Sequence, residues 1–222
     1  MLYKTRGIVF RITKYGDTSI IVNIFTHLFG LQSYIVNGVR SKSSRNAISL
    51  YQPLTLLDMV VYHRESANIL RIKEARCLHA YQSIHTDIRK TTIALFLSEL
   101  LNKSVKDQSN AELIYDFLMR SFITLDQLDA VENFHLIFLI KLSRHLGFGP
   151  QATHEILEGQ RVTEVEDRAL QELLVKDFGN CPAISYEVRT RLLECLLAFY
   201  GRHIESLGEI RSVNVLREIL GN

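Results

Sequence analysis

Residues 19–36 read SIIVNIFTHLFGLQSYIV, two alternating runs on either side of a turn at Phe29-Gly30. The residues on every second position are Ile20, Val22 and Ile24 in the first run, and Leu31, Ser33 and Ile35 in the second. A period of two residues is typical of a β-strand that buries one face. The stretch therefore predicts two neighbouring strands and gives the first part of the chain a β framework.

The same pattern extends on both sides of this hairpin. Ile8, Phe10 and Ile12 alternate before a Gly16-Asp17 turn, and apolar runs occupy residues 54–62 and 69–78. Five short strands with turn signals predict a small closed barrel over residues 1–80. An OB-fold barrel fits the strand lengths and spacing, and an SH3-like barrel is the structural alternative.

From about residue 81 the apolar period changes to 3.6 residues, which predicts helices up to Leu220. Gly147 to Pro150 ends the third of them, Thr163 and Glu166 form a capping box, and Ser185 caps another helix. The fold class is therefore α+β. We expect a five-stranded OB-fold barrel over residues 1–80, an all-α helical domain over residues 81–222, and no zinc module.

Charge is divided unevenly between these two parts. Residues 1–80 hold 11 Lys and Arg against 4 Asp and Glu, whereas residues 81–222 hold 15 against 20. The basic first part is expected to meet a polyanion, of which nucleic acid is the commonest.

Residues 34–45, YIVNGVRSKSSR, show where such a polyanion would bind. The strand breaks at Asn37-Gly38 and opens into a serine-rich loop with Arg40, Lys42 and Arg45, and no acidic residue lies between Asp17 and Asp58. This loop is a candidate DNA contact, and a solvated hairpin loop is the alternative.

Further DNA-binding candidates lie elsewhere on the expected barrel. They are Arg11, with Lys14 and Tyr15 in the loop between the first two strands, and Arg71 and Lys73 on one face of the fifth strand. Cations would hold phosphates, and an exposed Tyr15 ring would stack on a base of any kind. Partial burial of Tyr15 and a solvated strand face at Arg71 and Lys73 are the alternatives.

Signatures of other functions are weak. No Gly-rich phosphate loop occurs, the histidines lack metal-ligand spacing, and the cysteines Cys77, Cys181 and Cys195 are expected to be buried thiols. We expect no catalytic residues, no metal and no cofactor. The chain shows no secretion signal and no membrane span, which favours a cytoplasmic location.

Several segments, in matching order and spacing, resemble the RecO family of bacterial recombination mediators. They are Gly7-Ile8-Val9, Tyr15-Gly16-Asp17, residues 22–26 leading to Gly30, Gly38-Val39-Arg40 with Lys42-Ser43, Gln52-Pro53-Leu54, residues 145–151, and residues 200–216 with Arg211-Ser212. The resemblance implies a bacterial, nucleoid-associated protein with an OB domain that binds single- and double-stranded DNA and anneals complementary strands. It also implies a helical domain that docks the C-terminal tail of single-stranded-DNA-binding protein, a partner RecR, and an indirect role in loading RecA.

Two departures from the family pattern matter. Residues 152–160 contain no cysteine where many members carry a four-cysteine zinc module, and Asn37 stands where the family often has a lysine. For the partner tail we expect a pocket on the helical part, and helix-surface cations over a buried apolar stripe are the alternative. The expected pocket residues are Phe117, Arg120, Phe138, Lys141, Leu142 and Arg144.

The sequence therefore predicts a non-enzymatic DNA-binding and strand-annealing mediator of recombinational DNA repair. It would help to load recombinase onto single strands coated by single-stranded-DNA-binding protein. The alternatives are a nucleic-acid-processing enzyme and a protein-interaction scaffold with an OB barrel.

Overall fold

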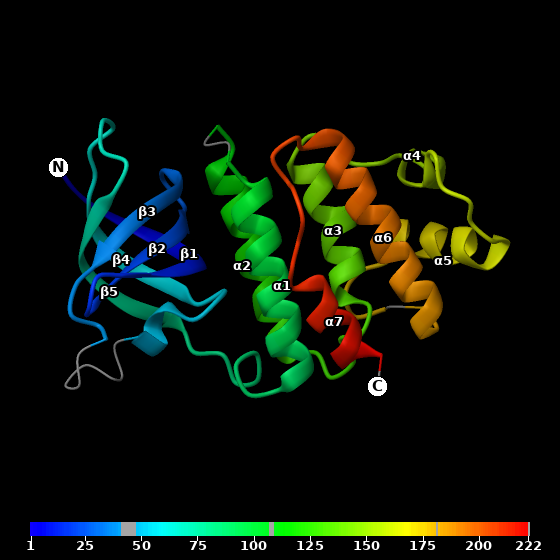
Figure 1. The fold of residues 1–222 in the computed structure, drawn as a ribbon, viewed down its shortest axis with the longest axis horizontal. Coiled ribbons are helices and arrows are strands. Elements are labelled where there is room, and N and C mark those ends of the chain that lie inside the picture. Colours follow the sequence, from blue (N-terminus) through cyan, green and yellow to red (C-terminus); the bar gives the residue numbers. More distant parts are fainter. Residues whose placement is uncertain (41–47, 107–108, 181, 222) are drawn as a thin grey trace. The chain divides into compact units, whose positions relative to one another are not determined.

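A computed structural model describes residues 1–40, 48–106, 109–180 and 182–221 of the chain (Figure 1). In these residues the strands are β1 (Leu2–Tyr15), β2 (Ser19–Thr26), β3 (Gly30–Val36), β4 (Leu56–Tyr62) and β5 (Leu70–His79), with a 3-10 turn η1 (Ile48–Tyr51) before β4. The helices are α1 (Ile88–Ser104), α2 (Ala111–Gln127), α3 (Phe134–His145), α4 (Thr153–Leu157), α5 (Glu164–Val175), α6 (Tyr186–His203) and α7 (Val213–Leu220).

The five strands close into a barrel in the order β1-β2-β3-β5-β4. Long β1 pairs with β4 through its first half and with β2 through its second half, and β3 and β5 pair in parallel. This connectivity is that of an OB barrel rather than an SH3-like one, so the predicted fold class of an OB barrel followed by helices is confirmed.

Both strands of the hairpin at residues 19–36 supply side chains to the barrel interior. Ile20, Val22 and Ile24 face the core as predicted, together with Tyr34, which is fully buried. Two glycines, Gly16 and Gly30, adopt the left-handed backbone conformation that the turns at the ends of β2 require.

Two of the predicted faces are wrong. In β3 the core residue is Tyr34, so Ile35 lies on the outside, and β1 is not regular. The register of β1 shifts between Val9 and Arg11, where Val9 pairs with Ile24 and Arg11 with Asn23. Val9 and Ile12 point into the barrel, so Ile8 and Phe10 lie on its outer face. There the Phe10 ring stacks on Phe25 with the ring centroids 5.7 Å apart.

The chain divides into two compact units. Unit 1 comprises residues 1–82 and 98–122, and unit 2 comprises residues 83–97 and 123–222. In unit 1 the barrel is joined to the helical segment by polar contacts: Asn23 donates to Asn102 at 2.8 Å, and the Arg6 guanidinium lies 5.1 Å from the Tyr115 ring centroid.

In unit 2 the helix ends follow the sequence signals. The Thr163 hydroxyl accepts a hydrogen bond from the Glu166 amide, and the Ser185 hydroxyl accepts one from the Val188 amide, as predicted. The last helix, α7, ends at Leu220, as the apolar period predicts.

Candidate nucleic-acid interface

A continuous row of side chains crosses the outer face of the barrel. The strand register pairs Thr13 with Ile21, Ile21 with Ile35, Ile35 with Arg71, and Arg71 with Tyr62. Their chain neighbours point into the core: Ile12, Val22, Tyr34, Leu70 and Val61. Directly paired residues project from the same face, and neighbouring strands lie about 4.8 Å apart. Because the barrel is closed, this outer row follows its circumference, over an arc of about 19 Å across five strand positions.

Three of the predicted DNA-binding residues project outward from the barrel, in or beside this row. Arg71 belongs to the outer row, while Arg11 and Tyr15 lie two residues before and after Thr13 on β1. All three are exposed, and Tyr15 is 50% exposed. The structure thus brings together side chains that are 56 to 60 positions apart in the sequence. Lys14 is exposed at the same end of β1, where its backbone pairs with Ile20.

Arg40 is tied to the turn between β1 and β2. Its side chain donates a hydrogen bond to the Gly16 carbonyl at 3.1 Å, and its amide donates to the Thr18 carbonyl at 3.0 Å. The neighbouring Ser19 hydroxyl donates to the Asn37 side chain. The start of the basic loop is therefore fixed beside Tyr15. The other two predicted loop cations, Lys42 and Arg45, lie outside the described residues.

Lys73 occupies an irregular position on β5. The register shifts there, since Val61 pairs with Ile72 and Val60 with Glu74, so strict alternation is interrupted. The Lys73 ammonium is exposed and lies 3.7 Å from the Glu74 carboxylate. An exposed ion pair of this kind is weak, so the Lys73 ammonium stays available to a phosphate.

Sequence reasoning missed Tyr62, because it treated residues 54–62 only as an apolar strand. The structure leaves Tyr62 48% exposed at the end of β4. The available signal was its position: it is the last apolar residue before the polar segment His63-Arg64-Glu65, where a strand leaves the core.

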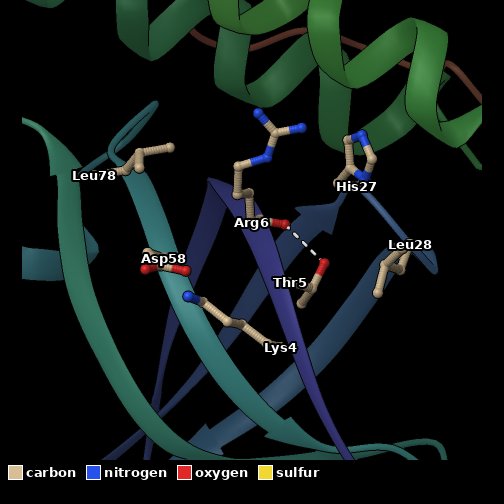
Figure 2. A pocket seen from close by; sticks show the side chains of 7 residues that line it. All are labelled: Lys4, Thr5, Arg6, His27, Leu28, Asp58 and Leu78. Carbon is tan, nitrogen blue, oxygen red and sulfur yellow. Dashed lines mark hydrogen bonds between the residues drawn. The ribbon is translucent and has the colours of Figure 1, made fainter.

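A hollow of about 380 Å³ lies on the neighbouring part of the outer face (Figure 2). It is lined by Lys4, Thr5, Arg6, His27, Leu28, Asp58 and Leu78. Figure 2 shows Arg6 and His27 pointing toward the helices of unit 1, whereas Lys4 and Asp58 lie lower on the sheet.

Carboxylates of α2 lie beside two of the side chains in this hollow. Arg6 lies 3.9 Å from Asp116, and His27 lies 3.5 Å from Glu112. Burial raises the pKa of Tyr115, whose ring Arg6 covers, to about 12. Lys4 is different, because its side chain has no hydrogen bond or ion pair with any residue in the described part of the chain.

Two of the four barrel carboxylates, Asp58 and Glu74, are engaged by cations, which weighs against the nuclease alternative. One oxygen of Asp58 accepts hydrogen bonds from two nitrogens of Arg76, at 2.6 and 3.0 Å, and Glu74 faces Lys73. Within the described ranges, no group of three or more His, Cys, Asp or Glu side chains could hold a metal ion.

The predicted peptide pocket is divided between the two units. Phe117 and Arg120 lie on α2 in unit 1, and the other four residues lie on α3 in unit 2. Phe138 and Leu142 are fully buried, so a peptide on α3 would have to meet Lys141 and Arg144. Lys141 donates to Asp177 at 2.6 Å, and this contact lowers the pKa of the Asp177 carboxyl. Arg144 donates to the Leu174 carbonyl at 2.8 Å.

The prediction of buried thiols holds for one of the two cysteines that the structure describes. Cys195 is buried on α6, where desolvation raises the pKa of its thiol. Cys77 is exposed on β5, and its thiol contacts the His79 carbonyl. In the described residues no helix is both long and apolar enough to cross a bilayer.

Comparison with known proteins gives a consistent result over the whole chain. Residues 1–81 match the family model for the N-terminal part of recombination protein O, and residues 85–221 match the one for its C-terminal part. The DNA repair protein RecO of Flavobacterium johnsoniae is 33% identical, with 99% of each chain covered. Those of Christiangramia forsetii, with 100% of each chain covered, and Bacteroides fragilis, with 99%, are 32% and 30% identical. Together with the OB barrel and its basic outer face, these matches show that the chain belongs to the RecO family.

Proposed function

We propose that this protein is a DNA-binding, strand-annealing mediator of recombinational DNA repair. One observation carries the proposal: the outer row places Arg71 between apolar positions, with Arg11 also on the outside of the barrel and an exposed tyrosine toward each end. An OB surface that combines cations with aromatic rings suits a flexible, unpaired strand.

The mode of binding follows from the kinds of side chain on this face. Arg11, Lys14 and Arg71 would neutralise phosphates, and Tyr15 would stack on a base, so neither contact depends on sequence. A protein that holds unpaired strands in this way leaves the base edges free. Such a strand can then pair with its complement, which is the physical requirement for annealing.

The protein's partners are part of the same proposal. Relatives of the chain are named DNA repair protein RecO. We infer a cytoplasmic, nucleoid-associated protein that acts with RecR, with the acidic tail of single-stranded-DNA-binding protein and, through them, with RecA. Lys141 and Arg144 on α3 are the cations that such a tail would meet in unit 2.

The decisive experiment measures single-strand affinity as a function of salt. Arg11→Ala and Arg71→Ala should each weaken binding and reduce the slope of log affinity against log salt by about 1. The triple change of Arg40, Lys42 and Arg45 to alanine tests the basic loop in the same way. Lys176→Ala removes an exposed lysine in unit 2 and serves as the control.

Two outcomes would count against the proposal. Unchanged affinity and slope in all three variants would show that the barrel face does not hold the strand. Strand cleavage with divalent metal that Asp58→Asn abolishes would instead indicate an enzyme acting on nucleic acid.

A further inference from the structure

We propose that Tyr62 forms a second base-stacking position, with Arg71 and Lys4 as flanking phosphate contacts, at the β4 end of the outer row. The inference rests on the proposed function. It extends the path of the bound DNA strand along the outer row from β2 and β3 to β4 and the first half of β1. Its ligand is an unpaired nucleobase with its two neighbouring phosphates.

Tyr62 differs from most of the nine tyrosines in its surroundings. Seven of them are buried, hydrogen-bonded, or in contact with another ring or a guanidinium: Tyr3, Tyr34, Tyr51, Tyr81, Tyr115, Tyr186 and Tyr200. Tyr15 and Tyr62 are the two that are about half exposed and lack any such contact with the described residues. An exposed ring with no partner on a strand face is available to stack on a base.

The neighbours of Tyr62 supply the rest of a nucleotide site. Arg71 pairs with Tyr62 across β4 and β5, and its side chain makes no hydrogen bond or ion pair with a described residue. On the β1 side of β4, Leu2 pairs with Tyr62, and the Leu2 side chain is 48% exposed. The ring therefore lies between a free cation and an apolar side chain, which suits a base attached to its phosphate.

Lys4 provides the next cation along this path. It lies two residues after Leu2 on β1, on the same outer face and about 7 Å along the strand. Its ammonium borders the hollow of Figure 2 and has no ion pair among the described residues. The opposed carboxylate in the hollow, Asp58, is already bonded to Arg76. A phosphate that follows the stacked base would therefore meet Lys4.

A fluorescence experiment tests the stacking contact directly, because the chain contains no tryptophan. Tyr62→Trp introduces a single indole at the proposed position, and Tyr186→Trp introduces one on α6 as the control. Oligothymidylates of about 4 to 16 nucleotides are titrated into each variant of the full chain, and binding is followed in parallel by anisotropy of the labelled strand. We expect strand binding to quench the indole at position 62 and to leave the one at position 186 unchanged.

Affinity measurements test the energetic role of the same residue. Tyr62→Leu should lower the affinity for the longer strands about 5- to 100-fold without changing the salt slope, and Tyr62→Phe should keep wild-type affinity. Lys4→Ala should reduce the slope by about 1, and only for strands long enough to pass Tyr62.

The outcomes separate this inference from the proposed function. If the unaltered chain binds strands but position 62 is not quenched and Tyr62→Leu binds normally, the second stacking position does not exist. If the unaltered chain binds no strand even at low salt, the proposed function fails, and this inference fails with it.

Discussion

The Arg40 side chain donates a hydrogen bond to the Gly16 carbonyl, 3.1 Å away, and so joins the loop after β3 to the turn between β1 and β2. Arg40 is half-buried in this position, whereas Arg71 on β5 is exposed and has no side-chain partner among the described residues. The two cations are thus in different states before any strand binds. One supports the fold of the barrel end, and the other is free.

This difference predicts different effects of two arginine substitutions. Arg40→Ala should lower the free energy of unfolding by about 1 kcal/mol, because a hydrogen bond between the turn and the loop is lost. Arg71→Ala should leave stability within about 0.5 kcal/mol of wild type. Urea denaturation of both variants checks this, and equal stabilities would show that the Arg40 contact does not support the fold.

Gly7 has no room for a side chain inside the barrel. A Cβ atom there would lie 2.5 Å from Ile24 Cγ2 and 2.5 Å from Met59 Cε. Gly7→Ala should therefore destabilise the protein by about 1 to 3 kcal/mol through overpacking. Gly179→Ala is the matched control, because no atom lies within 4 Å of its added Cβ. Thermal unfolding that is equal in the two variants would contradict this packing.

A buried lysine, Lys90, links the first turns of α1 to the segment that precedes this helix. Lys90 is only 5% exposed, and its ammonium donates to the Ser83 hydroxyl and to the Asp126 carbonyl, both at 2.7 Å. Lys90→Met keeps the length of the side chain but leaves these acceptors short of a donor, at a cost of about 1 to 3 kcal/mol. The change should lower Tm by several degrees in calorimetry, whereas the surface change Lys176→Met should not. A stable Lys90→Met variant would show that the methionine packs as well as the charged network.

His135 should make stability depend on pH. Burial lowers the pKa of this imidazole to about 3, with a smaller contribution from Arg189, whereas its pKa in the unfolded chain is about 6.5. As the pH falls, His135 therefore binds a proton in the unfolded state at a higher pH than in the folded state. The stability that the neutral ring contributes is complete above about pH 6.5 and is lost as the pH falls toward about 3, by up to about 1.4 kcal/mol per unit.

Comparison with a variant isolates this contribution from that of other groups. The difference in free energy of unfolding between wild type and His135→Phe should change across pH 6.5 to 4.5, with wild type losing more stability at the lower pH. Urea denaturation at several pH values measures it. A difference that is independent of pH would mean that His135 is solvated or protonated in the folded protein.

The sequence alone determined the fold class of this protein. Alternation in residues 19–36 and its neighbours predicted five strands, the change of period near residue 81 predicted the helices, and the caps at Thr163 and Ser185 were correct. These signals are local, since each depends on residues within one turn or one strand. The excess of Lys and Arg in residues 1–80 also needs no structure.

Only the tertiary structure decided which side chains share a face. The register shift in β1 moved Ile8 and Phe10 to the outside, and the closure of the barrel paired Arg71 with both Ile35 and Tyr62. Cross-strand partners depend on long-range pairing, and a one-residue shift exchanges the two faces of a strand. For this reason Tyr62 appeared in the sequence only as the end of an apolar run, while in the folded barrel it is an exposed ring beside a free arginine.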